Sequence, residues 1–203
     1  STKKMSVSGS LFDMDKLHDV SKNVISRMSA EDVYDSVAKW SADNDPAFHE
    51  LFVRDPEMTK QFLAIGRGGK KPRKDLALWS ETKAYMDFMF DELFQPDYSG
   101  MPERAKADAK AILTEYQDVY DAQDEMTVWF DKVKALAERH GFAPETKLYK
   151  KNPEQYKGPV GDISMVLRVA ICGRTNAPDL YSVMQLMPTE KIKARLAAAC
   201  EAL

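Results

Sequence analysis

Nine residues in the first half of the chain, Gly66 to Lys74, read GRGGKKPRK and carry five cationic side chains. Three glycines and a proline in the same stretch predict a loop rather than a helix or a strand. Lys and Arg at this density suit contact with a phosphate backbone, and glycine lets that backbone approach closely. A solubilising loop and a basic run of the nuclear-import kind are the alternatives.

A second candidate is Arg168, in the segment GDISMVLRVAICG at 161–173, where apolar residues surround the charge on almost every side. A charged side chain in such surroundings needs a partner. Two interpretations stay open. Either Arg168 forms an internal salt bridge with a nearby carboxylate, or its guanidinium is held towards a planar or anionic ligand, on which it can pair bidentately or stack.

A third candidate is a basic block in which lysines alternate with tyrosines, a composition typical of contact with a nucleic-acid backbone. The lysines are Lys147, Lys150, Lys151 and Lys157, and the tyrosines are Tyr149 and Tyr156. Further on, Gly173 is expected to end a helix and Pro178 to begin the next. Arg174 lies on the turn between them.

Other chemistry finds little support in the sequence. His18, His49 and His140 are scattered, without Cys or His at ligand spacing, and Cys172 and Cys200 are too few for a disulfide framework. The glycines before Lys70 do not form a phosphate-binding P-loop, because the G-x-x-x-x-G-K-[ST] pattern is absent. Pairs of carboxylates are common only on acidic helices, where solvated faces are the simpler interpretation. We predict no catalytic residue and no metal site.

Composition places the chain among soluble globular proteins. Its 203 residues are 44% hydrophobic and 30% charged, with no apolar run of membrane-spanning length and no signal peptide, so we expect a cytoplasmic protein that does not bind a membrane. The net charge of -3 conceals an asymmetry. Residues 66–80 carry five Lys and Arg against one acid, and 143–203 carry nine against six, whereas 81–142 carry seven against fourteen. We expect the two basic blocks to share one face.

Apolar spacing predicts an all-α fold. Ser29 with Asp32 forms a capping-box-like helix start, and Ser80 is expected to begin a helix whose buried stripe reaches Leu93. Two further helices are predicted, at 102–120 and at 127–140. The stretch QPDYSGMPE at 95–103 holds two prolines and a glycine, which indicates a boundary between two consecutive helical bundles, residues 1–97 and 98–203.

The segment GDISMVLRVAICGRTNAPDLYSVMQLMPTEKIKARL resembles the C-terminal signature of glutamyl-tRNA synthetases. That signature runs as Pro-Leu-Arg-x-Ala in a helix, a short turn, Pro-x-Leu-Phe and a final helix ending Arg-Leu. RGGKKPRKDLALWSETKAYMDFMFDELF resembles the basic Pro-Arg loop and aromatic-ended helix of that family, and SGSLFDMDKL the start of its helical region. The resemblance implies an anticodon-binding region built as two helical cages.

The resemblance also implies roles for individual residues. Arg73 matches the arginine that reads the first anticodon base, and Arg168 matches a second base-contacting arginine. The turn and helix start that enclose the third base match Ala177, Pro178, Leu180 and Tyr181, although Tyr181 can equally be a core residue. We expect contacts with the RNA backbone from Arg67, Lys70, Lys71, Lys74, Lys147, Lys150, Lys151 and Arg174.

Departures from the family pattern concern details and one large element. Val166 stands where proline is usual, Cys172 where threonine is common, and Met187 begins a changed turn. The nucleotide-binding catalytic fold is missing, and KMSVS at 4–8 lacks the second lysine of the family's KMSKS loop, so we treat it as a coincidence. These residues therefore look like a C-terminal fragment of an ATP-dependent glutamate–tRNA ligase, inactive alone, with ATP and magnesium belonging to the missing part.

The partner implied is the tRNA for glutamate, with the tRNA for glutamine left open, bound by a monomer. Two other interpretations remain. One is the anticodon-binding domain of class I lysyl-tRNA synthetase, and the other is a helical protein-interaction module in which residues 66–74 dock an acidic partner without RNA.

Overall fold

The computed structural model describes residues 13–203; KMSVS at 4–8 and the start of SGSLFDMDKL lie outside the described residues. The chain divides into two compact units, Ser1–Tyr85 and Met86–Leu203. Each unit has its own set of helices and its own buried core, and each is described here by itself.

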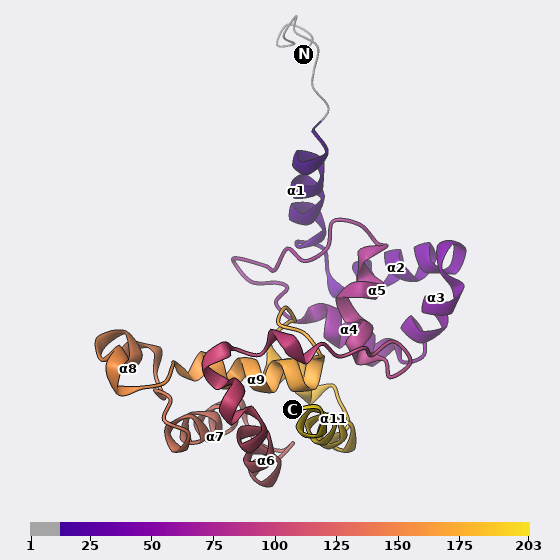
Figure 1. Ribbon diagram of the computed structural model, residues 1–203. Coiled ribbons are helices and arrows are strands. Elements are labelled where there is room, and N and C mark those ends of the chain that lie inside the picture. The colour runs from indigo at the N-terminus through magenta and orange to yellow at the C-terminus, as the bar shows by residue number, and fades with distance from the viewer. Residues whose placement is uncertain (1–12) are drawn as a thin grey trace, which may run out of the picture. The chain divides into compact units, whose positions relative to one another are not determined.

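Residues 13–86 form five helices: α1 (Met14–Ile25), α2 (Ala30–Asn44), α3 (Pro46–Phe52), α4 (Pro56–Ala64) and α5 (Glu81–Met86), all labelled in Figure 1. The first four begin at a side-chain cap, from Asp13, Ser29, Asp45 and Asp55. Each cap accepts a hydrogen bond from a backbone N–H that the helix itself leaves without a partner. The predicted helix start at Ser29 is confirmed, with its Oγ 3.0 Å from the backbone nitrogen of Asp32.

Helix α2 packs against α3 and α4 to form the core of this unit. Val33 and Val37 lie one turn apart on the same face of α2 and are fully buried, as are Phe48, Phe52 and Phe62 from the two helices opposite. This 3.6-residue spacing is the apolar stripe expected of a surface helix facing a core. The loop at 66–74 follows α4, one of the helices packed in this core.

The second unit contains six α-helices: α6 (Ala109–Val119), α7 (Met126–Arg139), α8 (Thr146–Lys151), α9 (Val160–Cys172), α10 (Leu180–Gln185) and α11 (Thr189–Ala202). Short 3-10 turns lie at Asp87–Met89, Tyr98–Gly100, Glu103–Asp108 and Pro153–Gln155. Helix α9 is central, with eight buried residues, and Figure 1 shows it lying across α6, α7 and α11. A helix that is apolar on nearly all sides belongs in such a core position.

The helix expected to run from Ser80 to Leu93 is shorter than predicted. Helix α5 ends at Met86, a 3-10 turn follows, and Phe90 is already extended, with φ −105° and ψ 127°. The chain passes here from the first unit to the second. Apolar residues before and after this point pack in the cores of different units. The helix that the local pattern predicts is therefore interrupted between them.

The division between the units also falls earlier than the predicted 97/98 boundary. Asp87 pairs with Arg174, Asp91 with Lys191, and the backbone N–H of Asp97 donates to the carbonyl of Gly173 at 2.9 Å. These contacts attach the stretch from 87 to 97 to the second unit. Pro and Gly marked a change of direction in the chain, whereas the unit boundary is set by long-range contacts.

The predicted all-α class is confirmed. Between residues 13 and 203 the structure contains no strand, and only one isolated bridge, between Ala143 and Pro159. None of the helices in this range combines the length and the apolar character needed to cross a membrane.

Candidate nucleic-acid interface

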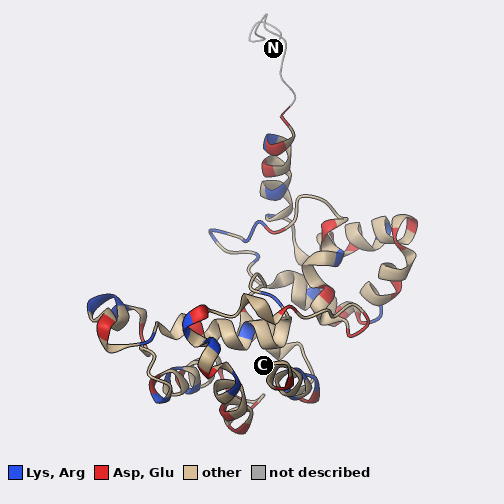
Figure 2. Ribbon diagram, viewed as in Figure 1, with Lys and Arg blue, Asp and Glu red and all other residues tan. Residues whose placement is uncertain are grey.

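The first unit has an open hollow of about 730 Å³ beside the loop at 66–74, which we call the cationic hollow. Its lining residues are Asn23, Ser26, Arg27, Gly68, Gly69, Lys70, Lys71, Pro72 and Lys74. Four of these side chains are cationic and none is acidic. Figure 2 shows blue along this loop, which lies beside the helix labelled α1 in Figure 1. A concave surface lined by one sign of charge concentrates anions near it.

Arg67 belongs to the loop in sequence but faces inward. Its Nε donates to the carbonyl of Leu63 at 2.6 Å and its Nη1 to the carbonyl of Ile25 at 2.6 Å. These carbonyls lie at the C-terminal ends of α4 and α1, where helices leave acceptors without partners. Burial lowers the pKa of Arg67. Its guanidinium therefore anchors the loop to the helices and is not displayed towards a phosphate.

Arg73 is held in a defined orientation by Asp75. The Arg73 Nε and Nη2 atoms each donate to one Asp75 oxygen at 2.8 Å, and the hydroxyl of Tyr85 donates to the same carboxylate at 3.2 Å. The bidentate pair raises the pKa of Arg73, because the carboxylate hydrogen-bonds to the charged guanidinium. The side chain keeps 38% of its surface exposed. Its Nη1 edge has no protein acceptor among residues 13–203 and remains available to a ligand.

Gly66 makes this orientation possible. Its φ is +76°, a left-handed conformation that side chains disfavour, and a Cβ here would lie 2.6 Å from Cδ of Arg73. The backbone N–H of Arg73 also donates to the Gly66 carbonyl at 3.0 Å, which closes the loop. The stem of Arg73 thus lies across the space that a larger residue would fill.

Sequence reasoning missed Arg27, Asn23 and Ser26, which form the α1 side of the cationic hollow. They lie about forty residues before the loop in the chain, and their spacing carries no motif. A basic residue just after the last turn of a helix was the only available signal, and it is common at helix C-termini for electrostatic reasons.

The second unit has a hollow of about 380 Å³ with a different character, here called the Arg168 hollow. Its lining residues are Met126, Thr127, Trp129, Phe130, Ser164, Arg168, Asp179 and Leu180. Apolar and aromatic side chains dominate, with one guanidinium and one carboxylate. Asp179 already accepts from the N–H and the hydroxyl of Ser182, at 2.9 and 2.8 Å, as the cap of α10.

The internal salt bridge expected as one interpretation of Arg168 is not what the structure shows, whereas its contact with a ligand stays a prediction. Its Nη1 donates to the carbonyls of Ala177 and Pro178, at 2.8 and 2.6 Å, and within residues 13–203 it forms no ion pair. The two carbonyls fix the guanidinium and the turn to each other. One face of the arginine is thereby used to hold the turn, while the side chain still lines the hollow.

The turn and helix start that the resemblance assigned to the third base contribute unequally. Leu180 lines the Arg168 hollow, whereas Ala177 and Pro178 are buried and present their carbonyls to Arg168. Tyr181 donates its hydroxyl to the carbonyl of Asp124 at 2.9 Å and packs 5.5 Å from the ring of Trp129. Tyr181 is thus partly a core residue that supports the wall of the hollow.

Arg174 is engaged inside the second unit. Its Nη2 donates to both oxygens of Asp87, the longer bond being 2.6 Å, and its guanidinium lies over the ring of Phe88 at 5.5 Å. A charge-assisted pair on an aromatic face is a stable arrangement for arginine. The Arg174 guanidinium is thus held by partners within the protein, and its expected contact with the RNA backbone stays a prediction.

The most buried arginine was not singled out from the sequence. Arg195 on α11 is 4% exposed and donates to the carbonyl of Ile171 at 2.8 Å and to Asp91 at 3.3 Å. Its guanidinium lies 3.7 Å from the centroid of the Phe94 ring. Desolvation lowers the pKa of Arg195. Burial of a charge with these partners marks a residue that organises the unit rather than one that meets a ligand.

The basic block on α8 is exposed. Lys147, Lys150 and Lys151 face solvent and form no ion pair within the described residues, whereas Lys157 pairs with Asp108 at 2.6 Å. Figure 2 shows the blue segment at the end of α8. These three lysines are free to meet phosphates.

The two cysteines of the chain, Cys172 and Cys200, are free thiols. Cys172 is buried, and burial raises the pKa of its thiol to about 11, so it is protonated at neutral pH. Among residues 13–203, no group of three His, Cys, Asp or Glu side chains is arranged to hold a metal ion.

Comparison with known families gives this geometry a class. A family model described as "Anticodon binding domain" matches residues 73–200, from Arg73 through the Arg168 hollow to α11. The chain belongs to this anticodon-binding domain family, and it is homologous to the C-terminal part of glutamate–tRNA ligases.

Three curated relatives show the extent of the similarity. The glutamate–tRNA ligase of Acetivibrio thermocellus is 41% identical over 196 residues, which are 97% of this chain and 36% of the relative. That of Sorangium cellulosum is 42% identical over 196 residues, 96% of this chain and 34% of the relative. That of Clostridium perfringens strain 13 is 40% identical over 197 residues, 95% of this chain and 36% of the relative. The chain thus spans about a third of the length of these relatives.

Proposed function

We propose that this chain binds the anticodon loop of the tRNA for glutamate, as the anticodon-binding region of a glutamate–tRNA ligase. The observation that carries the proposal is the family match over residues 73–200, which contains Arg73 and the whole Arg168 hollow. The names of the relatives supply the amino acid. The two hollows supply chemistry that suits an RNA loop, one for phosphates and one for a base.

In the first unit, the cationic hollow binds the backbone. Arg27, Lys70, Lys71 and Lys74 offer four charges around one open space, and none of them is neutralised by a carboxylate in the lining. Phosphate contacts of this kind provide affinity without reading sequence. Arg73 reads the first anticodon base, because its Nε and Nη2 atoms are fixed by Asp75 and its Nη1 edge points away from that pair.

In the second unit, the Arg168 hollow takes a base. Unstacked loop bases bind proteins by stacking on aromatic or guanidinium planes and by hydrogen bonds at their edges. Trp129, Phe130 and Leu180 supply apolar walls, and Arg168 supplies donors. The lysines at 147, 150 and 151 contact the backbone nearby on the same unit.

The parent activity that the relatives' names describe is ligation of glutamate to tRNA. We propose that residues 1–203 by themselves do not perform it, because the roles argued here belong to recognition and none to adenylate chemistry. ATP and magnesium would act in the part of the enzyme that lies beyond this chain's alignment. We further propose that the chain acts in the cytoplasm as a monomer, and that the tRNA for glutamine is a second candidate ligand.

Fluorescence anisotropy with labelled anticodon stem-loops tests the proposal. The glutamate stem-loop should bind more tightly than a lysine stem-loop of the same length, and the glutamine stem-loop measures how strongly the first base is read. Equal binding of all three would leave only a general affinity for RNA. ATP-dependent charging of tRNA by this chain alone would overturn the assignment of its role to recognition.

A further inference from the structure

Phe130 lies between two hollows of similar size in the second unit. It lines the Arg168 hollow, and it also lines a neighbouring hollow of about 320 Å³, here called the α8 hollow. The other residues of the α8 hollow are Lys134, Pro144, Glu145, Thr146, Lys147 and Val160. One aromatic ring thus belongs to the wall of both spaces.

Two side chains lie close to the ring of Phe130. Trp129 lies 6.0 Å away between ring centroids, and its indole N–H donates to the hydroxyl of Tyr116 at 2.8 Å, which fixes it in the core. Nζ of Lys134 lies over the Phe130 ring, 5.2 Å from its centroid. Phe130 is half-buried, so part of the ring remains open to a ligand. A partly open aromatic on a fixed support is a platform on which a base can stack.

Charge continues past the ring. Arg168 lies on one side, and Lys134 and Lys147 line the other. Lys134 is already paired with Asp131 at 2.9 Å, and Glu145 is the one carboxylate in the lining of the α8 hollow. Lys147 forms no ion pair within the described residues. It is therefore the cation of this hollow that is most available to a phosphate.

We propose that the α8 hollow binds the nucleotide adjacent to the one in the Arg168 hollow. A base stacks on Phe130, at the wall that the two hollows share, and Lys147 contacts the phosphate that joins the two nucleotides. The occupant is RNA because the two hollows share a wall and carry cations on both sides, as a strand of alternating bases and phosphates requires. This inference rests on the proposed function, and it adds a stacking residue and a second nucleotide site that the sequence did not indicate.

A glutamate anticodon stem-loop with 2-aminopurine placed at each loop position in turn tests the stacking. The fluorescence of this base falls when it stacks, so the parent protein should quench it at one or two positions. Phe130→Leu should restore the fluorescence at those positions and weaken binding by roughly 5- to 100-fold. Phe130→Trp keeps an aromatic face and should preserve the quench. Melting curves of both variants check that the fold survives, and Phe130→Met serves if the leucine variant does not fold.

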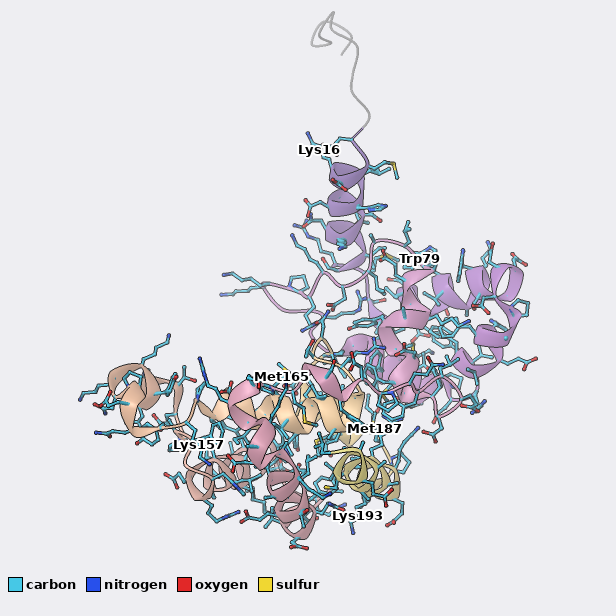
Figure 3. All side chains as sticks on the ribbon, viewed as in Figure 1. Lys16, Trp79, Lys157, Met165, Met187 and Lys193 are labelled. Carbon is cyan, nitrogen blue, oxygen red and sulfur yellow. The ribbon has the colours of Figure 1, made fainter. Side chains whose placement is uncertain are left out.

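The lysine contact has its own control. Lys147→Gln should reduce the slope of log affinity against log salt by about 0.7, the value for one contact with single-stranded nucleic acid. Lys193→Gln removes an exposed charge from α11 and should leave the slope unchanged. Figure 3 shows Lys193 well away from the helix labelled α8 in Figure 1, which has the same view.

The outcomes separate this inference from the proposed function. If the parent binds the stem-loop and Arg168→Met weakens binding, but Phe130→Leu changes neither the quench nor the affinity, the α8 hollow is not a nucleotide site and the proposed function stands. If the parent binds no stem-loop, both fall together.

Discussion

The two units present hollows that differ in what they can recognise. The cationic hollow is larger, about 730 Å³ against 380 Å³, and four lysine and arginine side chains line it without a carboxylate. The Arg168 hollow is lined mainly by apolar and aromatic side chains around a single guanidinium. Phosphate is a repeated, sequence-independent ligand and a base is a planar, partly apolar one. Under the proposed function, the cationic hollow therefore supplies affinity, whereas the Arg168 hollow, together with Arg73 of the first unit, supplies discrimination between bases.

The arginines sharpen this comparison. In both units, arginines that look alike in sequence have opposite roles. Arg67 and Arg195 are turned inward onto helix carbonyls, whereas Arg27 and Arg168 line open hollows. Substitutions that separate stability from RNA affinity can therefore break or support the comparison, and they follow from the largest expected effect to the smallest.

Gly173 and Gly66 test whether the two loops are equally rigid. Both have a positive φ, but a Cβ at Gly173 would lie 2.7 Å from the backbone Cα of Pro96, whereas a Cβ at Gly66 would meet only the movable side chain of Arg73. Gly173→Ala should cost roughly 3 kcal/mol of unfolding free energy, from left-handed strain plus overpacking, and Gly66→Ala about 1 to 2 kcal/mol. Denaturant unfolding measures both. Equal losses would show that the cationic loop is packed as tightly as the end of α9.

Arg195 and Arg168 give a comparison within the second unit. Arg195→Met should lower the unfolding free energy by about 2 to 3 kcal/mol, because the carbonyl of Ile171 loses its donor and no guanidinium lies over the ring of Phe94, with RNA affinity unchanged. Arg168→Met should cost about 1 to 2 kcal/mol of stability, because two turn carbonyls lose a donor, and a further 1 to 3 kcal/mol of RNA affinity. A weaker affinity in the Arg195 variant alone would reverse the assignment.

Arg73 and Asp75 should act together in base recognition by the first unit. Arg73→Gln should change the preference between stem-loops that differ at the first anticodon base by roughly 1 to 3 kcal/mol, more than it changes overall affinity. Asp75→Asn should produce part of the same effect, because the guanidinium keeps its charge and loses its orientation. The two changes together should cost less than their sum. Equal weakening for every anticodon would make Arg73 a phosphate contact instead.

The salt dependence of binding should come mainly from the cationic hollow. Replacing Lys70, Lys71 and Lys74 by Ala should lower the log–log slope by roughly 0.7 for each phosphate that is no longer neutralised, and Arg27→Gln by a similar amount. Lys39→Gln, an exposed charge on α2, is the control. An unchanged slope in the triple variant would place the RNA backbone elsewhere on the molecule.

Two aspartates should make small contributions of opposite sign to the pH dependence of stability. Hydrogen bonds from Lys83 and from the backbone N–H of Phe48 lower the pKa of Asp45, so its contribution to stability is present at neutral pH and is lost as the pH falls below its usual value near 3.8. Burial raises the pKa of Asp162. When the pH is above the usual pKa of aspartate, the charged carboxylate of Asp162 therefore disfavours folding. Asp45→Asn should therefore destabilise and Asp162→Asn should stabilise at pH 7. Both differences should shrink in acid, as melting curves at pH 3 and pH 7 would show.

The sequence predicted the helical class, several of the helices and the charge of the 66–74 loop because these depend on neighbours in the chain. Ser29 begins a helix, α9 is apolar on nearly all sides, and the loop at 66–74 is basic, all as expected. The helix ending at Met86 was predicted too long because two cores, and not the local pattern, decide where it stops.

The orientation of each cation could not be predicted. Arg67 finds the carbonyl of Ile25 from another helix, and Arg195 finds that of Ile171. Arg27 joins a loop far along the chain. Interactions between distant segments leave no spacing that can be read in one sequence, so the sequence predicted which residues carry charge but not which of them face a ligand.

One measurement tests the central claim most directly. The dissociation constant of the parent protein is compared, at one salt concentration, for a glutamate anticodon stem-loop and for the same stem-loop with all three anticodon bases replaced. Phosphate contacts are equal in the two RNAs, so the difference reports base recognition by Arg73 and the Arg168 hollow. We predict that the replaced loop binds roughly 100-fold more weakly, from about 1 to 3 kcal/mol at each base that is read. Equal dissociation constants would contradict the account, because the chain would then hold RNA by charge alone.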